Sequence, residues 1–376
     1  MSACICLAAN TLGYPEGGGH LWAHLNWALS FRALGCRVLW LEIISPAEPV
    51  TKLQSRILAL RERLQPYDLA GSLILCPMGN ALQPEGLAAA CLDSDLAATA
   101  DLLIKLYYEL PAAIVKWFRR SALLDIDPGL LQIWISKKQL QIAPHDLYFT
   151  IGETVGRPGA RFPDAGLKWH YTPPCVALDR WPVTPAPEQA PFTTVTHWYA
   201  NEWMEEAGGI YCNNKRSGFL PFLDLPRSIT YPLELALCLS EDESEERDAL
   251  LQRGWRLKDT AAVASTPWDY QHYIQHSKGE FSCCKPSCVR LQNAWISDRT
   301  LCYLASGKPA VVQHTGPSRF LPTDSGLFRF HDLSEAVQQL EQVIADYDRQ
   351  CKQARALAEE YFDGRKIASR LLESLL

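Results

Sequence analysis

Short apolar runs alternate with amphipathic segments along most of this chain. The first run, residues 3–9, is followed by a glycine-rich loop, a segment at 20–34 whose apolar residues have helical spacing, and a second run at 38–42. The two runs predict buried strands, and the segment between them predicts a helix that ends at Gly35. A strand, a helix and a strand within about forty residues form the unit from which parallel sheets are built. The pattern therefore predicts an α/β fold.

The alternation continues on both sides of a proline-rich stretch at residues 173–191. Before this stretch we expect helices at 50–66 and 84–98, a strand and a helix within 101–118, and strands at 73–76, 122–127 and 146–153. After it we expect helices at 232–239, 268–276, 297–306 and 333–376, and strands at 192–195, 261–263, 280–284 and 310–313. Because proline favours extended and exposed connections, we interpret the stretch as a linker between two α/β halves.

Length and composition agree with two folded domains. A chain of 376 residues is too long for one ordinary core, and 48% apolar with 21% charged residues is typical of a globular protein. The formal net charge of −6 and the lack of a basic stripe argue against a protein that holds a nucleic acid backbone. Thirteen cysteines without a CxxC pair, and no signal peptide, indicate a reducing cytoplasm. No apolar run approaches the ~20 residues that span a bilayer, so we expect a cytoplasmic protein without a transmembrane segment.

The glycine-rich loop of the first half carries a candidate catalytic residue. Gly18 and Gly19 open the first predicted helix, where a ligand can approach the backbone closely and the helix dipole attracts negative charge. His20 follows them, and an imidazole at this place can take a proton from an acceptor hydroxyl. The alternative interpretation is a tight turn with His20 as a helix cap, since the loop lacks the spaced glycines of a dinucleotide site. Two carboxylates, Asp127 and Glu153, also follow predicted strands.

A second site is predicted in the other half, between residues 297 and 316. Ser297 can cap the helix that follows it, Asp298 suits the first helical turn, and the strand at 310–313 leads into a polar loop. A capped helix beside a strand with a polar loop is suited to hold a diphosphate and a sugar. Lys285 follows another predicted strand and is suited to neutralise phosphate charge, whereas we expect Lys215 and Arg216 to be solvent-exposed.

The second-half segments at 298–299, 303–309 and 313–316 resemble the donor-binding part of GT-B glycosyltransferases. In particular they resemble a sparsely characterised bacterial group related to the family 1 and family 4 enzymes. The Gly18-Gly19-His20 segment, the Asp-x-Asp-Pro-Gly sequence at 125–129, the Gly-Glu-Phe sequence at 279–281 with Lys285, and residues 358–362 match the same group in order.

The resemblance implies a GT-B fold, in which two Rossmann-like domains face each other across a cleft. Residues 1–185 would form the acceptor domain, residues 190–353 the donor domain, and residues 354–376 a helix that crosses back to the first domain. It further implies a reaction that needs no metal. We expect a UDP- or dTDP-linked sugar as the donor and an inverting hexosyl transfer without a cofactor, with a retaining mechanism, in which His20 would not act as a base, as the alternative. His20 would be the general base, with Glu153 or Asp127 next in line. The residues expected to bind the donor are Gly18, Gly19, His197, Lys285, Ser297, Asp298, Arg299, Gln313, His314, Thr315 and Gly316.

Two positions depart from the pattern of the group. Cys302 stands where the fold commonly has a ribose-binding glutamate, so other groups would hold the ribose, or the nucleotide differs. His314 stands where the group has aspartate. A nucleotide-sugar epimerase or phosphorylase on the same fold, and an inactive nucleotide-sugar-binding protein, are the alternatives. The acceptor is unidentified, with a small molecule or glycan favoured over nucleic acid by the acidic charge.

Overall fold

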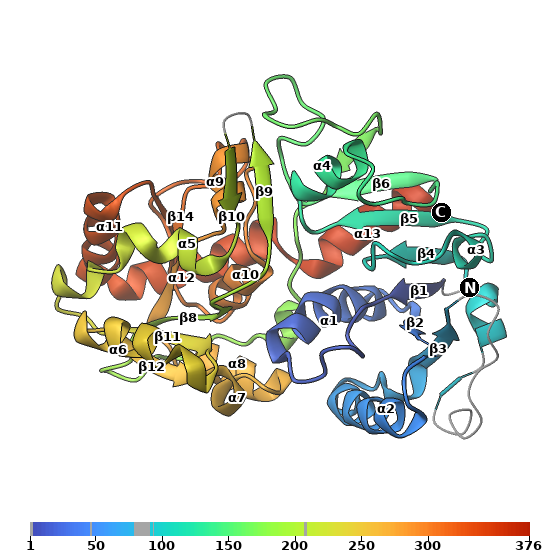
Figure 1. Cartoon of the computed structure of the whole chain (residues 1–376), viewed down its shortest axis with the longest axis horizontal. Helices are drawn as coiled ribbons and strands as arrows, with labels where there is room; N and C mark the ends of the chain where they lie inside the picture. Colours follow the sequence, from blue (N-terminus) through green and yellow to red (C-terminus); the bar gives the residue numbers. More distant parts are fainter. Residues whose placement is uncertain (1–2, 46, 79–90, 93, 207–208) are drawn as a thin grey trace. The chain divides into compact units, whose positions relative to one another are not determined.

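The chain folds into two compact units in a computed structural model, which describes residues 3–45, 47–78, 91–92, 94–206 and 209–376. Unit 1 comprises Met1–Gly156, Phe162–Ala177 and Gly364–Leu376, and unit 2 comprises Arg157–Arg161 and Leu178–Asp363. Each unit is built around a sheet of parallel strands with helices between them (Figure 1).

Unit 1 contains a seven-stranded sheet in the order β3-β2-β1-β4-β5-β6-β7, in which every pair is parallel. The strands are β1 (Cys4–Ala8), β2 (Arg37–Ile44), β3 (Leu73–Pro77), β4 (Leu102–Lys105), β5 (Ser121–Asp125), β6 (Leu147–Thr150) and β7 (Trp169–Tyr171). The helices are α1 (Gly18–Ala33), α2 (Val50–Leu64), α3 (Ala112–Val115), α4 (Leu130–Ser136) and α13 (Gly364–Leu375). The central strands are almost continuously apolar because both of their faces are covered.

The last helix of the chain belongs to unit 1, where α13 packs against α1. Gly364 opens α13 and contacts α1 so closely that a Cβ atom there would lie 1.9 Å from Oγ of Ser30. Its amide also donates a 3.0 Å hydrogen bond to the carbonyl of Val176. A glycine is therefore needed where this helix begins.

Unit 2 contains a six-stranded parallel sheet in the order β12-β11-β8-β13-β14-β15 and a separate antiparallel pair, β9 and β10. The strands are β8 (Phe192–His197), β9 (Trp203–Glu206), β10 (Gly209–Cys212), β11 (Leu233–Cys238), β12 (Arg256–Asp259), β13 (Gly279–Ser282), β14 (Ala310–Gln313) and β15 (Leu327–Phe330). The helices are α5 (Lys215–Phe219), α6 (Ser244–Gln252), α7 (Thr260–Val263), α8 (Pro267–Gln275), α9 (Pro286–Leu291), α10 (Asp298–Ala305), α11 (Leu333–Ala345) and α12 (Tyr347–Tyr361).

An aromatic core holds one face of the unit 2 sheet. The rings of Phe281 and Phe330 stack with their centroids 5.3 Å apart, and Phe222 packs edge-on against Phe330 at 5.0 Å. Leu340 and Val343 of α11 belong to the same buried cluster. Burial of such side chains is the main stabilising contribution to a sheet of this kind, at about 1.5–3 kcal/mol for each side chain.

The strand order of both sheets reverses at one point, and this reversal predicts where a ligand binds. In unit 1 the strand order reverses beside β1, and in unit 2 it reverses beside β8. Ligands of open parallel sheets bind at the carboxyl ends of the strands next to such a reversal. Ligands are therefore expected beside the loops that follow β1 and β4 in unit 1, and β8 and β13 in unit 2.

Two predicted elements of the second half are wrong. The segment at 232–239, expected to be a helix, contains β11, a strand whose leucines and alanine are buried between two covered faces. Burial in a parallel sheet overrides the helix propensity of leucine and alanine. The segment at 261–263, expected to be a strand, belongs to α7, whose first turn is capped by Asp259. The strand is the preceding β12, and β15 was not predicted.

The helix expected at 84–98 lies mostly outside the described residues; Ser94–Thr99 forms a 3₁₀ helix. The other predicted strands and helices are confirmed, although 333–376 is divided into three helices rather than one. No helix in the described parts of the chain has both the length and the apolar composition that crossing a membrane requires.

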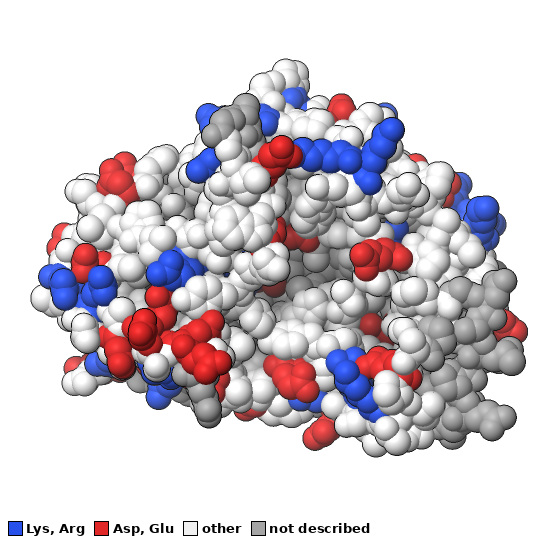
Figure 2. All heavy atoms as spheres, in the orientation of Figure 1, with Lys and Arg blue, Asp and Glu red and all other residues white. Residues whose placement is uncertain are grey.

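Charged side chains are interspersed over the face of the molecule drawn in Figure 2. Acidic side chains gather over α6 of unit 2, where Asp242, Glu245 and Asp248 are exposed.

Candidate functional site

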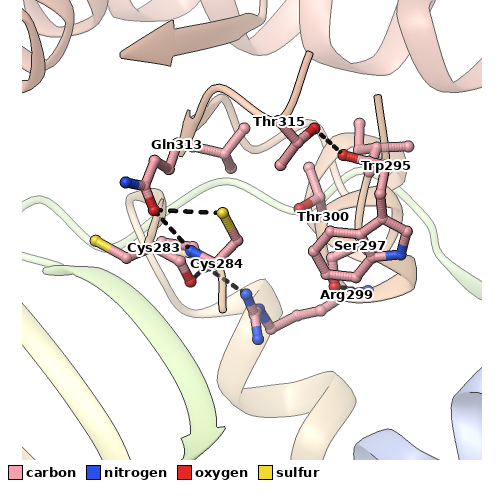
Figure 3. Close-up of a pocket in the computed structure, with 11 residues that line it drawn as sticks. Cys283, Cys284, Trp295, Ser297, Arg299, Thr300, Gln313 and Thr315 are labelled. Atoms are coloured by element: carbon pink, nitrogen blue, oxygen red, sulfur yellow. Dashed lines mark hydrogen bonds between the residues drawn. The ribbon is translucent and has the colours of Figure 1, made fainter. Parts of the chain in front are cut away.

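A small pocket opens in unit 2 at the carboxyl ends of β13 and β14, beside the N-terminus of α10 (Figure 3). One of these strands, β13, lies beside the reversal of strand order in unit 2. The residues lining the pocket are Ser282, Cys283, Cys284, Trp295, Ile296, Ser297, Arg299, Thr300, Val312, Gln313 and Thr315. Four of the residues predicted to bind a donor are among them, namely Ser297, Arg299, Gln313 and Thr315.

Helix α10 directs its N-terminus at the pocket. Ser297 has the extended backbone of an N-cap, and its side chain accepts a 3.3 Å hydrogen bond from the amide of Arg299. Ser297 and Thr300, one turn apart, both line the pocket. The amide groups of a helix N-terminus carry partial positive charge, so this end of the pocket attracts an anion.

Arg299 lines the pocket, but its guanidinium is bonded to protein groups. Its Nε donates to Glu280 at 2.8 Å, and its Nη1 donates to the carbonyl of Val195 at 2.9 Å. Its Nη2 donates to the hydroxyl of Ser282. Burial opposes the charge of Arg299, but the Glu280 carboxylate outweighs it and raises the pKa above the ordinary value. The arginine therefore ties the ends of β8 and β13 together and remains charged beside the pocket.

Gln313 and Thr315 fix the loops that form the pocket wall. The Oε1 of Gln313 accepts hydrogen bonds from the amide of Cys284 at 3.1 Å and from its thiol at 3.3 Å (Figure 3). The hydroxyl of Thr315 donates to the carbonyl of Trp295 at 2.6 Å. Both side chains are uncharged, and their hydrogen bonds hold neighbouring loop segments in place.

Lys215 is the residue that sequence reasoning missed. It was expected to be solvent-exposed, yet it is half-buried, and its Nζ donates to the carbonyl of Cys283 at 2.8 Å and lies 5.8 Å from the ring centroid of Trp295. Burial, with the positive charge of Arg299, lowers its pKa to about 8. Because the Nζ of Lys215 lies against two residues that line the pocket, Cys283 and Trp295, its positive charge is close to any phosphate that binds there.

The local sequence explains why Lys215 lies there. Asn214 caps the short helix α5, and its side chain accepts a 2.9 Å hydrogen bond from the amide of Ser217. Gly218 on the same helix lies against the segment that follows β13, where a Cβ would be 1.9 Å from the carbonyl oxygen of Cys284. The cap before Lys215 was the available sequence signal for a helix here.

Other predicted donor residues of unit 2 do not line this pocket. The Nζ of Lys285 lies 2.5 Å from a carboxylate oxygen of Glu202. His197 is exposed at the end of β8, and Asp298 is half-buried in the first turn of α10. A phosphate would have to displace Glu202 to gain the charge of Lys285.

His314 and Gly316 shape the loop that follows β14. The Nδ1 of His314 accepts a 3.2 Å hydrogen bond from the amide of Gly316, and the ring stacks on His331 with the centroids 4.4 Å apart. Burial, helped by the charges of His331 and Arg329, lowers the pKa of His314. Gly316 has φ of +134°, and a Cβ there would lie 2.7 Å from the carbonyl oxygen of Gln292. The loop therefore requires glycine at this position.

In unit 1, His20 lies in the first turn of α1, after Gly18 and Gly19. Its Nε2 lies 2.6 Å from the carbonyl oxygen of Asn10, in the loop that follows β1. Because a carbonyl can only accept, Nε2 carries the proton, and in the neutral ring Nδ1 is then the basic nitrogen. The hydrogen bond to the carbonyl thus sets the tautomer of the ring.

The Asp-x-Asp-Pro-Gly segment at the end of β5 forms a hydrogen-bonded network. Asp125 is fully buried and accepts hydrogen bonds from Gln132 at 2.8 Å and Thr150 at 2.7 Å. Burial raises its pKa to about 7, against the stabilising effect of these donors. Tyr108 donates to Asp127 at 3.1 Å, so Asp127 is a half-buried carboxylate held in a defined place.

The remaining carboxylates of this sheet edge differ in role. Glu153, after β6, is buried with 3% of its surface exposed. Glu42, which only weakly resembled a ribose-binding acid, accepts hydrogen bonds from the amide of Thr11 at 3.0 Å and from the indole of Trp40 at 2.9 Å. It therefore fixes the loop before α1. Within the described residues, no three His, Cys, Asp or Glu side chains are grouped as metal ligands would be.

Comparison with known proteins identifies the fold family. No family model and no curated protein matches the sequence. HepE of Anabaena, solved with UDP and glucose, is 13% identical with a TM-score of 0.58, over 99% of this chain and 99% of its own. Sucrose-phosphate synthase of Thermosynechococcus elongatus is 12% identical with a TM-score of 0.57, over 99% of this chain and 98% of its own. An alpha-glucosyltransferase in complex with UDP is 11% identical with a TM-score of 0.59, over 99% of both chains.

Identities this low establish a fold and leave chemistry to the site. The match extends over nearly the whole chain in each case, and the chain itself contains two parallel α/β sheets of the same strand order. The chain therefore has the GT-B fold of glycosyltransferases, as the resemblance predicted.

Proposed function

We propose that the protein is a glycosyltransferase that moves a hexosyl group from a nucleotide sugar to an acceptor hydroxyl. The observation that carries the proposal is the pocket at the ends of β13 and β14, which the capped N-terminus of α10 borders and whose lining residue Cys283 accepts a hydrogen bond from the half-buried Lys215. Structures of its neighbours of the same fold contain UDP or UDP-glucose. A site of positive charge and polar walls is suited to the diphosphate of such a donor.

The donor domain, residues 190–353, would hold the diphosphate. Lys215 and the first turn of α10 would neutralise the phosphate charge as it builds up on the leaving group. Trp295 would offer a flat apolar face at the pocket edge. Cys302 is only 1% exposed, so its thiol does not replace the ribose-binding glutamate of the fold, and the ribose would bind other groups.

The acceptor domain, residues 1–185 together with α13, would hold the nucleophile; residues 354–361 belong to α12 and to unit 2. We assign His20 as general base: its Nε2 proton is donated to Asn10, and Nδ1 takes the proton of the acceptor hydroxyl as that oxygen attacks the anomeric carbon. Attack from the face opposite the leaving diphosphate inverts the anomeric configuration. Asp127 and Glu153 are the carboxylates that would replace His20 as base.

We also propose a cytoplasmic enzyme that transfers without a metal or cofactor. The positive charges of Lys215 and the helix N-terminus would act on the leaving diphosphate, so chelation of divalent cations should leave the rate unchanged. A small molecule or glycan suits the acceptor better than a polyanion, since the net charge is −6.

The test is calorimetric titration with UDP, dTDP, ADP and GDP, and then with sugars linked to the nucleotide that binds. We expect UDP or dTDP to bind and the matching nucleotide sugar to release its nucleoside diphosphate in the presence of an acceptor pool. Product with an altered sugar and the nucleotide still attached would favour an epimerase. Binding without any turnover would favour an inactive binding protein.

A further inference from the structure

Two exposed histidines, His272 and His276, lie one turn apart at the C-terminal end of α8, and the second of them is its C-cap. Their ring centroids are 3.8 Å apart, with an angle of 30° between the ring planes. The amide of His276 donates a 3.0 Å hydrogen bond to the carbonyl of His272, so the helical turn continues through the cap. The two side chains therefore leave the same face of the same turn.

The backbone beneath this pair is anchored in unit 2. Ile274, between the two histidines, is fully buried, and Ser277, directly after them, is 1% exposed. The hydroxyl of Ser277 donates a 2.8 Å hydrogen bond to the carbonyl of Tyr273, and its oxygen lies 2.6 Å from Oγ1 of Thr193 in β8. Side chains on so fixed a turn are already placed for a ligand, and little order has to be gained when the ligand binds.

The ring nitrogens of the pair are available to a ligand. The Nδ1 of His276 lies 2.8 Å from the carbonyl oxygen of His272. Because the carbonyl can only accept, Nδ1 carries the proton, and Nε2 of the neutral ring keeps its lone pair. A carbonyl orients many metal-binding imidazoles in this way. Among the described residues, the ring nitrogens of His272 have no hydrogen-bond partner.

We propose that His272 and His276 together bind one divalent transition-metal ion, such as Zn²⁺, through one nitrogen of each ring, with water in the remaining positions. Two nitrogens that each lie ~2.1 Å from one ion are about 3–3.4 Å apart, which is close to the present spacing of the rings. Imidazole suits such ions, whereas Mg²⁺ and Ca²⁺ prefer oxygen ligands.

This site is separate from the proposed nucleotide pocket. Only Ser277 and Lys278 stand between His276 and the amino end of β13, whereas the pocket lies at the carboxyl end of that strand. The ion would therefore stabilise α8 rather than take part in transfer. Gln275 of this helix donates a 3.3 Å hydrogen bond to the carbonyl of Pro182, so an ion that holds the last turn of α8 also steadies that contact.

The test is calorimetric titration of the whole reduced protein, freed of metal with EDTA, with ZnCl₂, and thermal unfolding with and without the ion. We expect His272→Ala and His276→Ala each to lower the Zn²⁺ affinity at least about tenfold and to remove the rise in Tm that Zn²⁺ gives the wild type. MgCl₂ should neither bind nor stabilise. His331→Ala and Cys238→Ser, which replace an exposed histidine and an exposed cysteine elsewhere, should behave like the wild type.

A wild type that binds no Zn²⁺, wild-type affinity in either His272→Ala or His276→Ala, or an equal loss in His331→Ala would overturn the proposal. Amide hydrogen exchange locates the ion independently. Peptides covering residues 267–277 should exchange more slowly with Zn²⁺, and protection confined to other segments would contradict the site. Because no nucleotide enters these measurements, failure of the proposed function leaves their outcome unaffected.

Discussion

The cationic residues of unit 2 near the pocket differ in whether their charge is already compensated by a carboxylate of the protein. Arg299 gives hydrogen bonds to Glu280, Val195 and Ser282, and Lys285 is paired with Glu202, so their charges are already compensated. Among the described residues, the acceptor of the hydrogen bond that Lys215 donates is a carbonyl, that of Cys283, at 2.8 Å. A cation without an anionic partner gains most when a phosphate arrives.

Lys215→Ala should lower the affinity for UDP about 10- to 100-fold, the equivalent of ~1.5–3 kcal/mol for a charged hydrogen bond. Arg216→Ala is the matched control, because this neighbour directs its guanidinium at Glu246, 2.7 Å away. Calorimetry on both variants makes the comparison. Equal losses in the two would mean that Lys215 does not contact the phosphate.

His20→Ala should lower the rate of transfer about 10²- to 10⁴-fold while the UDP affinity stays within a factor of about two, because a general base acts on the acceptor and not on the nucleotide. The measurement is the turnover of the nucleotide sugar identified by calorimetry. Unchanged turnover would remove His20 from the mechanism and direct attention to Asp127 and Glu153.

Asp125 makes a prediction about pH. Its pKa is raised from 3.8 to about 7, so the folded protein holds a proton that the unfolded chain releases between these values. Stability therefore falls as the pH rises through this window, and the loss is complete above the folded pKa. Relative to Asp125→Asn, the wild type should lose up to about 4 kcal/mol of unfolding free energy between pH 4 and pH 8.

Urea denaturation of the wild type and Asp125→Asn at a series of pH values gives this difference directly. Other carboxylates titrate in both proteins and cancel in the comparison. Parallel stability curves would show that Asp125 is ionised throughout.

At the scale of elements, more of the helices and strands than of the site contacts could be predicted from the sequence. Apolar runs and glycine stops located most strands and helices, including the β1–α1–β2 unit and the α10–β14 passage. The pattern failed at β11, since a strand buried on both faces has no alternation to distinguish it from a helix. It also failed for Lys215, because its environment depends on a contact of α5 with Cys283, a residue 68 positions further along the chain.

The loop after β14 contains Gly316, and replacing this glycine tests whether the conformation of the loop matters for stability and binding. Gly316→Ala adds a Cβ beside the carbonyl oxygen of Gln292 at a backbone conformation that other residues avoid. We expect a loss of about 1–3 kcal/mol in unfolding free energy and weaker UDP binding, because Thr315 in the same loop lines the pocket. Gly71→Ala, where a Cβ would meet no atom within 4 Å, should be close to neutral.

Thermal and urea denaturation of the two glycine variants, with UDP calorimetry, separate the effects. A stable Gly316→Ala variant with normal UDP affinity would mean that this loop plays no part in the pocket.

At the scale of the whole molecule, the chain repeats one layout twice and uses the two copies differently. Unit 1 presents a histidine and carboxylates at its strand ends, whereas unit 2 presents a capped helix and a lysine. This asymmetry supports our assignment of acceptor chemistry to the first unit and donor binding to the second. The resemblance of the GT-B sequence motifs predicted the fold, but which cations face the pocket depended on side-chain pairing that no linear pattern encodes.

The central claim, that a nucleotide sugar binds at the ends of β13 and β14, is tested most directly by amide hydrogen exchange of the reduced protein with and without saturating UDP. We predict slower exchange in peptides covering residues 282–288, 295–301 and 313–316, because a ligand that binds only the folded state suppresses local opening around its site. The β12 and α6 segments should be unaffected. Protection confined to other segments, or no protection by any nucleoside diphosphate, would contradict the account.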